Sequence, residues 1–240
     1  MSQRPRFIVV DGITGSGKST IIKSMKSELE KDGHRVFDLA AWCRTNAHLP
    51  RFEELEDIDT LFTFEPTKLW IGASIRHEMS RVDEPYSGHE LAEAFALDRL
   101  VQYKRLIIPA LRAGKTIVQD RSVTTSIAYQ PIMPGGPPVE HLLSLSGNQL
   151  ALAHAPHDLV LVDIPAQAAI ARLDARSDVS RGVFHDEELM QRIDERFKSD
   201  WFAELFTSRG TRLHRFNADV PLSEMQSNAT QLIQSILIHC

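Results

Sequence analysis

Residues 7 to 20, FIVVDGITGSGKST, constrain this chain more than any other part of its sequence. They contain the pattern G-x-x-x-x-G-K-[ST], met by Gly12, Gly17, Lys18 and Ser19, directly after a strand-like run and before a helix-like segment. In that context glycines let the backbone curl so that successive N–H groups point at phosphate oxygens, and the helix start adds positive potential. The pattern therefore predicts a P-loop that binds a nucleoside triphosphate.

The residues predicted to contact the triphosphate lie along this loop and the first turn of the helix. They are Gly12, Thr14, Gly15, Ser16, Gly17, Lys18, Ser19 and Thr20. Lys18 is expected to bridge the β- and γ-phosphates, and the hydroxyl of Ser19 to ligate Mg²⁺. A P-loop alone does not fix the reaction, because GTPases, helicases, transporters and kinases share it. The chain has no N-K-x-D guanine signature, which disfavours a GTPase.

Short β-branched runs alternate with longer helical patterns, which is typical of an α/β protein whose parallel sheet is covered by helices on both faces. The predicted strands are Phe7 to Val10, Arg35 to Leu39, Thr116 to Gln119, Leu159 to Val162 and Arg212 to Phe216. Residues 40 to 60 are irregular, and we interpret them as an insertion or a short extra helix. At 240 residues with 42% apolar residues, the chain is expected to form a single domain over residues 1–240.

The bulk composition limits the classes of ligand and compartment. A net charge of −5 argues against wrapping a nucleic-acid polymer and leaves small phosphates as better ligands. The two cysteines, Cys43 and Cys240, form no C-x-x-C pair, so neither a disulfide framework nor a structural zinc site is predicted. The chain also has no signal-peptide core and no run of eighteen apolar residues. We therefore expect a cytoplasmic protein without a membrane partner.

Three further segments narrow the prediction: FTFEPT at residues 62 to 67, FALDR at 95 to 99, and QDRSVTTSIAYQ at 119 to 130. With the P-loop, and in this order, they resemble the thymidylate kinase family of P-loop nucleoside monophosphate kinases, over residues 7 to 206. The resemblance implies a P-loop kinase fold with a five-stranded parallel sheet in the order 2-3-1-4-5. It also implies transfer of the ATP γ-phosphoryl group to dTMP or a related pyrimidine monophosphate, Mg²⁺ as cofactor, and a homodimer.

The residues that the resemblance places at the acceptor have side chains suited to a nucleotide. Phe95 can stack on a pyrimidine, and Arg99, four residues later on the same helical face, can bond a base carbonyl. Arg121 is suited to the acceptor phosphate, and Asp120 to Mg²⁺ together with Ser19. The full set expected to contact the acceptor is Glu65, Pro66, Arg76, Phe95, Arg99, Arg121, Thr125, Ser126, Tyr129 and Gln130.

Each of these residues also has a purely structural interpretation. Phe95 can belong to the core, Asp120 and Arg121 can form an ion pair that ends a strand, and Thr125 and Ser126 can cap a helix. Only their joint order favours the functional interpretation.

The segment ARLDARSDVSRGVF resembles the lid of bacterial-type members of the family, with bounds at about residues 172–186. A mobile arginine over the transferring phosphoryl group stabilises its negative charge, and Arg176 and Arg181 are the predicted catalytic arginines, beside Lys18 and Arg121. The competing interpretation is a solvated helix face that carries charge. We expect no general base, because a monophosphate acceptor is already anionic.

Two positions depart from the family pattern. Thr14 stands where members usually carry an acidic residue associated with the acceptor sugar, and Phe64 replaces the arginine of an R-E-P segment tied to the acceptor phosphate. One alternative is therefore a deoxynucleoside kinase that phosphorylates a neutral 5′-hydroxyl, with Asp120 or Glu65 as the base. Another is a regulatory module that binds ATP without transferring its phosphate.

Overall fold

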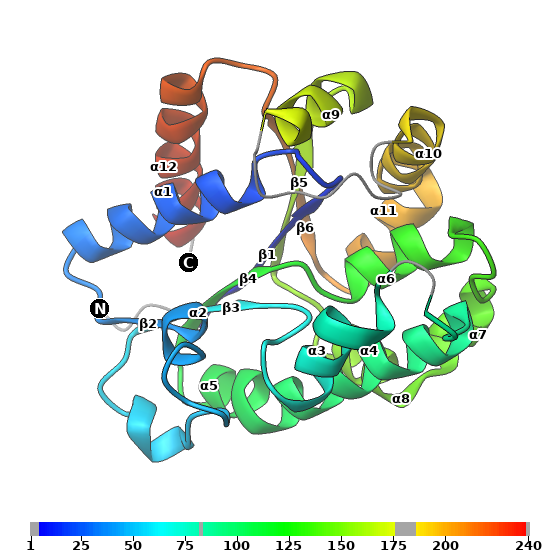
Figure 1. Cartoon of the computed structure of the whole chain (residues 1–240). Helices are drawn as coiled ribbons and strands as arrows, with labels where there is room; N and C mark the ends of the chain where they lie inside the picture. Colours follow the sequence, from blue (N-terminus) through cyan, green and yellow to red (C-terminus); the bar gives the residue numbers. More distant parts are fainter. Residues whose placement is uncertain (1–4, 82–83, 176–185, 239–240) are drawn as a thin grey trace.

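A six-stranded sheet, in which all neighbouring strands are parallel, forms the centre of the computed structural model, which describes residues 5–81, 84–175 and 186–238. The strands are β1 (Phe7–Gly12), β2 (Val36–Asp38), β3 (Thr60–Phe64), β4 (Thr116–Asp120), β5 (Asp158–Asp163) and β6 (Arg212–Asn217). Their order is β2-β3-β4-β1-β5-β6, which places the fully buried β1 next to β4 and β5 (Figure 1).

The prediction of five strands was wrong, because β3 was missed. The five predicted strands are β2, β4, β1, β5 and β6 in the predicted order, and β3 is inserted between β2 and β4. Its sequence TLFTF alternates threonine with apolar residues and follows an acidic segment, so it resembled the end of an insertion. The structure accommodates both threonines because the Thr63 hydroxyl donates a hydrogen bond to Gln119 Oε1 at 3.0 Å and the Thr60 hydroxyl is hydrogen-bonded to His34 Nδ1 at 3.0 Å. The rest of the expected α/β architecture is confirmed.

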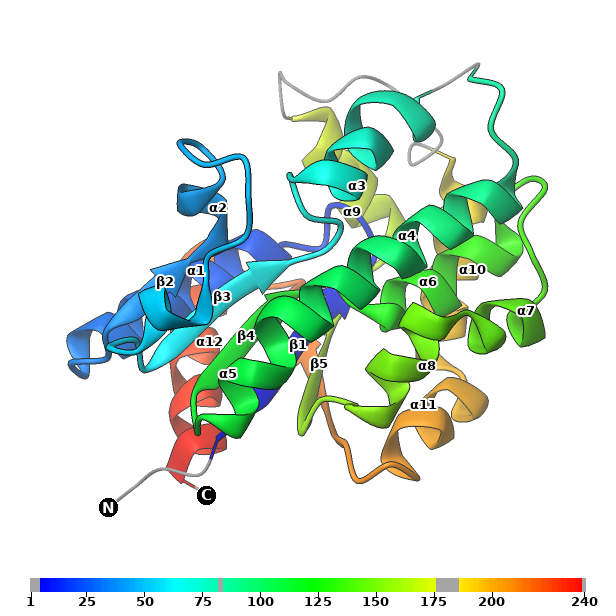
Figure 2. The same ribbon diagram turned by 90° about the horizontal axis from the view of Figure 1, so that it is seen from below.

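Helices cover both faces of the sheet (Figure 2). On one face α1 (Lys18–Lys31) packs along α12 (Leu222–Ile238). The opposite face carries α4 (Gly88–Gln102), α5 (Ile108–Arg112), α6 (Val123–Tyr129), α8 (Ser146–Ala153) and α11 (Asp200–Thr207).

Shorter elements complete the described chain. The remaining helices are α2 (Leu39–Trp42), α3 (Trp70–Ser74), α7 (Val139–Ser144), α9 (Ala166–Asp174) and α10 (Glu187–Lys198). Single 3₁₀ turns are η1 (Phe52–Leu55) and η4 (Gln130–Ile132), and π turns are η2 (Ile75–Met79) and η3 (Tyr103–Ile107). In the described residues, none of the helices has the length and apolar character needed to cross a membrane.

Helices α4 and α8 approach each other closely at Gly147. A Cβ atom added at Gly147 would lie 1.7 Å from the carbonyl oxygen of Ala96, so only glycine fits there. This contact matters for the candidate site, because α4 carries Phe95 and Arg99 and α8 carries Asn148.

We expect Gly147→Ala to destabilise the protein by about 3 kcal/mol, because the two helices must move apart. Gly33→Ala is a suitable control, since Gly33 has a φ of 86° but no atom within 4 Å of an added Cβ. The Gly33→Ala substitution should lower the free energy of unfolding by about 1 kcal/mol, from backbone strain alone. Urea unfolding of both variants measures the two losses of stability. Equal losses in the two variants would contradict a tight contact between α4 and α8.

Candidate active site

The carboxyl ends of β3, β4 and β1 lie side by side and bring the predicted motifs together. Asp120 at the end of β4 is in register with Phe64 of β3 and with Val10 of β1. The backbone N–H of Arg121 donates to the Val10 carbonyl at 3.0 Å, and that of Glu65 donates to the Asp120 carbonyl at 2.9 Å. Ligands of open parallel sheets bind at this edge, so the topology alone makes it the candidate site.

The P-loop connects β1 to α1 and curls as its glycines require. Gly12 and Gly15 have φ values of 144° and 83°, and a Cβ atom at either position would lie within 2.6 Å of a backbone carbonyl oxygen. Lys18 is 7% exposed, and its ammonium group donates to the carbonyls of Gly12 at 3.0 Å and Ile13 at 2.7 Å. The Lys18 ammonium therefore lies on the inner side of the loop, where it can meet an anion.

Asp11, which sequence reasoning missed, links the P-loop to the start of α6. Its buried carboxylate accepts hydrogen bonds from the hydroxyls of Thr124 and Thr125, both at 2.6 Å, and from the Gly12 N–H at 2.8 Å. The same carboxylate lies 3.4 Å from Nη1 of Arg121. One signal was available, because Asp11 is the only charged residue in an otherwise apolar strand.

Arg121 bridges the P-loop and α6. Its Nη2 lies 3.4 Å from the Thr14 hydroxyl, its Nη1 lies 3.3 Å from the Thr125 hydroxyl, and its guanidinium lies 5.5 Å from the centroid of the Tyr129 ring. Burial disfavours the charge, but Tyr129 and Asp11 outweigh burial and raise the pKa of Arg121 above its usual value. Arg121 therefore remains a cation next to the P-loop.

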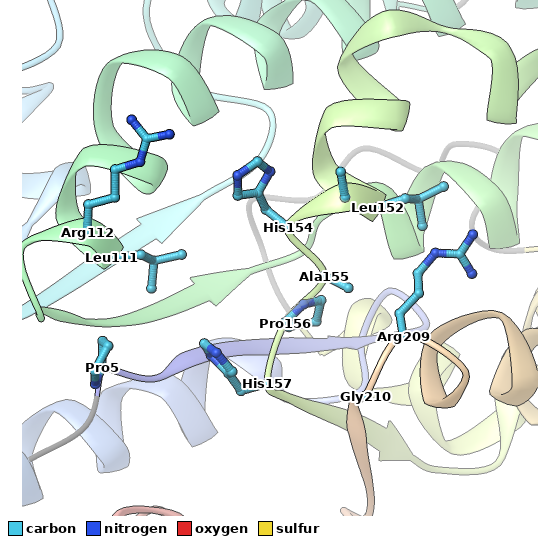
Figure 3. Close-up of a pocket in the computed structure, with 11 residues that line it drawn as sticks. Pro5, Leu111, Arg112, Leu152, His154, Ala155, Pro156, His157, Arg209 and Gly210 are labelled. Carbon is cyan, nitrogen blue, oxygen red and sulfur yellow. The ribbon is translucent and has the colours of Figure 1, made fainter.

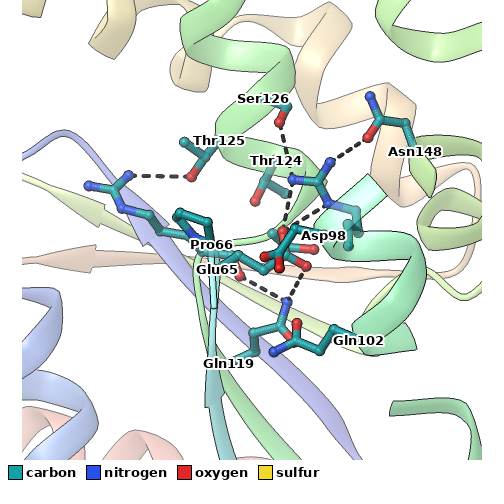
Figure 4. Close-up of polar contacts among 12 residues, drawn as sticks. Glu65, Pro66, Asp98, Gln102, Gln119, Thr124, Thr125, Ser126 and Asn148 are labelled. Carbon is teal, nitrogen blue, oxygen red and sulfur yellow. Dashed lines mark hydrogen bonds and ion pairs between the residues drawn. The ribbon is translucent and has the colours of Figure 1, made fainter. Parts of the chain in front are cut away.

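Glu65, Ser126 and Asn148 belong to a buried polar network (Figure 4). The buried side chain of Arg99 joins these three residues. Its Nε donates to Glu65 at 2.8 Å, its Nη2 donates to the Ser126 hydroxyl at 3.1 Å, and its Nη1 donates to Asn148. Glu65 also accepts a hydrogen bond from Gln119 at 3.1 Å. Every nitrogen of the Arg99 side chain thus has a protein partner, and its direct bond to a base stays a prediction.

Two buried carboxyl groups, Glu65 and Asp98, lie near the Arg99 guanidinium, and only Glu65 forms an ion pair with it. Burial raises the pKa of Glu65 from 4.5 to about 7, despite the nearby charge of Arg99, and the neighbouring charge of Asp98 adds to the rise. Burial also raises the pKa of Asp98, which accepts hydrogen bonds from the backbone and hydroxyl of Thr67, both at 2.7 Å. Both carboxyl groups therefore hold their protons more tightly than usual, because burial outweighs the nearby positive charge of Arg99.

A pocket of about 440 Å³ opens at this edge of the sheet. Its lining includes Ser19 and Lys23 from α1, Asp38 from β2, and Asp120 and Arg121 from the end of β4. The last residue of β3, Phe64, and residues that follow this strand complete the wall: Glu65, Pro66, Lys68 and Arg76. Among the predicted acceptor residues, the pocket therefore brings together Glu65, Pro66, Arg76 and Arg121.

Asp120 provides a free ligand atom to this pocket. Its Oδ1 atom is buried without a hydrogen-bond partner among the described residues. Burial raises the pKa of Asp120, while Lys18 and Arg121 partly offset that effect. A carboxylate oxygen and the nearby Ser19 hydroxyl are the hard oxygen ligands that Mg²⁺ prefers, so these residues fit a divalent cation bound mainly by water and phosphates.

A larger hollow, of about 670 Å³, lies at the opposite edge of the sheet (Figure 3). It is lined by residues that precede β1, β5 and β6, namely Pro5, His157 and Gly210, and by Arg112 and Arg209. It contains no residue of the P-loop. We therefore assign the active site to the smaller pocket at the carboxyl edge.

Comparison with known proteins decides the family. A family model described as thymidylate kinase matches residues 49–228. A probable thymidylate kinase of Pyrobaculum calidifontis is 31% identical over 189 residues, covering 79% of each chain. That of Pyrococcus abyssi is 32% identical over 74% of each chain. The thymidylate kinase of Xanthomonas oryzae is 30% identical over 72% of this chain and 62% of the relative.

The chain belongs to the thymidylate kinase family. It is accordingly a phosphotransferase, and the resemblance found in the sequence motifs is confirmed. The family model begins after the P-loop, so the P-loop rests on its own sequence pattern and geometry.

The remaining predicted thymidylate kinase site residues are less well defined by the structure. Phe95 is partly exposed on α4 and lies outside the hydrophobic core cluster, so the core interpretation does not fit it. The Oε1 atom of Gln130 is buried without a hydrogen-bond partner among the described residues. The two predicted lid arginines, Arg176 and Arg181, lie outside the described residues. Arg172 donates to the Ala218 carbonyl at 2.7 Å and contacts the P-loop backbone.

The free energy of unfolding should fall as the pH rises from 4.5 to 7, more for the wild type than for Glu65→Gln. The folded-state pKa of Glu65 lies above its ordinary value, so its stabilising contribution is complete below pH 4.5 and is lost as the pH rises through 7. The rise in the pKa of Glu65 corresponds to at most about 3 kcal/mol of the free energy of unfolding.

Urea unfolding of both proteins across this pH range measures the effect. Stability curves of the two proteins that stay parallel would show that Glu65 has an ordinary pKa.

Proposed function

We propose that this protein transfers the γ-phosphoryl group of ATP to dTMP, which forms dTDP and ADP. One observation carries the proposal: the guanidinium of Arg121 lies 3.4 Å from the Thr14 hydroxyl in the P-loop. A phosphate held by Arg121 would therefore lie next to a triphosphate held by the loop. The family assignment supports dTMP as the acceptor.

The chemistry needs positioning and charge neutralisation more than a base. The acceptor oxygen of dTMP is already anionic, and the transferring phosphoryl group spreads negative charge over its oxygens. Lys18 and the P-loop amides hold the donor phosphates, while Arg121 holds the acceptor phosphate in line with them. Both carboxylate oxygens of Glu65 are engaged, by Arg99 and by Gln119, so Glu65 is poorly placed to act as a base.

We propose separate roles for the other residues of the acceptor site. Phe95 stacks on the thymine ring, while Gln130 and Tyr129 line the nucleoside side of the site. Glu65, Pro66, Arg99, Thr125 and Ser126 support these contacts. Hydrogen bonds link Glu65, Arg99 and Ser126 to one another and Thr125 to Asp11 and Arg121. Arg176 and Arg181 are proposed to close over the phosphates.

We further propose Mg²⁺ as cofactor, held by the Ser19 hydroxyl and, through water, by Asp120. When bound, the ion neutralises charge on the phosphate oxygens. The unpartnered Oδ1 of Asp120 supports this assignment.

A cytoplasmic homodimer is the proposed form of the enzyme. The location is supported by ATP, a metabolite of the cell interior, and by the free thiol of Cys43. The dimer is supported by the family resemblance and by Leu97, which is 48% exposed on α4.

Wild-type protein with ATP and Mg²⁺ should release ADP when dTMP is added, and Lys18→Ala should lower kcat by about a hundredfold or more. A coupled ADP-release assay measures both, and the urea midpoint of the variant controls for folding. Release stimulated by thymidine but not dTMP would indicate a nucleoside kinase. ATP binding without stimulation by any acceptor would indicate a regulatory module.

Asp120→Asn should raise the Mg²⁺ concentration for half-maximal rate by on the order of tenfold, because the amide is a weaker and neutral ligand. Asp38→Asn is the matched control, since Asp38 lines the same pocket but pairs with Lys26 at 2.6 Å. Mg²⁺ titration of the initial rate distinguishes them. An unchanged requirement in Asp120→Asn would remove the proposed metal role.

A further inference from the structure

The side chain of Phe64 supports two cations on the wall of the candidate pocket. The ammonium of Lys68 lies 5.8 Å from the centroid of the Phe64 ring, and the guanidinium carbon of Arg76 lies 5.5 Å from it. All three residues line the same pocket as Ser19, Asp120 and Arg121. The ring face attracts both positive charges and keeps them close together despite their mutual repulsion.

The two cations differ in how far the protein already satisfies them. Nε of Arg76 donates to the carbonyls of Pro66 and Thr67, both at 3.0 Å, and its Nη2 donates to Pro66. The ammonium of Lys68 is exposed and has neither a hydrogen bond nor an ion pair with any residue that the structure describes. Arg76 is therefore fixed in place, whereas all three donors of Lys68 remain available.

The carboxylates of the pocket do not neutralise Lys68. Asp38 pairs with Lys26 at 2.6 Å, and Glu65 pairs with Arg99 at 2.8 Å. Asp120 directly precedes Arg121, and the positive charges of Lys18 and Arg121 act on its carboxylate. The Phe64 side of the pocket therefore carries an excess of positive charge that suits an anionic ligand.

We propose that Lys68 is a specificity-determining residue of the acceptor site, which grips the phosphate of the incoming monophosphate together with Arg76. This inference rests on the proposed function and adds to it a residue that no sequence motif indicated. Phe64 acts as the platform that directs both cations into the pocket. Lys68 thereby favours a phosphorylated acceptor over thymidine, whose 5′-hydroxyl offers no charge to hold.

The test is steady-state kinetics of Lys68→Met with dTMP and ATP varied separately. The KM for dTMP should rise about tenfold, while kcat and the KM for ATP stay within about twofold, because the contact exists equally in ground and transition states. The matched control is Lys23→Met, which removes the same charge from the same pocket but not from the Phe64 ring. Its KM for dTMP should change by less than about twofold.

An unchanged KM for dTMP in Lys68→Met would overturn the proposal. An equal rise of this KM in Lys23→Met would overturn it too, because the effect would then come from the overall positive charge of the pocket and not from a contact with Lys68. The Phe64→Leu variant adds a second test. If the ring positions Lys68, Phe64→Leu raises the KM for dTMP more in the wild-type background than in the Lys68→Met background, where only Arg76 remains over the ring. Equal effects in both backgrounds overturn the platform role for Lys68. If wild-type protein shows no dTMP-stimulated ADP release, the proposed function itself fails, independently of Lys68.

Discussion

The parallel pairing of β1 with β4 is the constraint on which the site depends. The Arg121 N–H binds the Val10 carbonyl at 3.0 Å, so the residue after β4 is tied to the strand that leads into the P-loop. Lys18 and Arg121 are more than a hundred residues apart in sequence, yet this register fixes both at one edge of the sheet. The P-loop and the guanidinium of Arg121 are thus brought together by backbone hydrogen bonds.

Buried polar groups then hold this edge in shape. Asp11 ties the P-loop to α6 through two threonine hydroxyls, and Arg99 ties β3, α4, α6 and α8 together through Glu65, Ser126 and Asn148. Buried charges of this kind are costly unless every partner is present, so the network favours one arrangement of the helices over others. The α4 side of the candidate site is therefore built on a rigid frame of buried polar contacts, with Lys68 and Arg76 at the pocket wall.

The sequence was sufficient to predict the elements that have strong local signals. Strands β1, β4 and β5 are nearly continuous apolar runs, and the P-loop pattern lies between a strand and a helix, so their positions followed from the residues alone. Strand β3 was missed because the partners of its two threonines, His34 for Thr60 and Gln119 for Thr63, are revealed only by the folded sheet.

The site could be predicted only in part, for a similar reason. Arg121 and Arg99 were identified from motifs, but no motif links them to their partners Asp11 and Asn148, which are distant from them in sequence. Helical spacing placed Phe95 and Arg99 on one face, yet it could not show that the Arg99 guanidinium is already committed to protein acceptors. Local patterns identify candidate residues, while long-range hydrogen bonds decide which atoms remain free.

The central claim is that donor and acceptor phosphates meet between Lys18 and Arg121. A crystal structure with adenosine and thymidine joined at their 5′ oxygens by a polyphosphate chain tests it most directly. We expect the phosphates at the adenosine end to contact the P-loop and Lys18, and the phosphate at the thymidine end to contact Arg121. A thymidine end bound away from Arg121, or at the opposite edge of the sheet, would contradict the account.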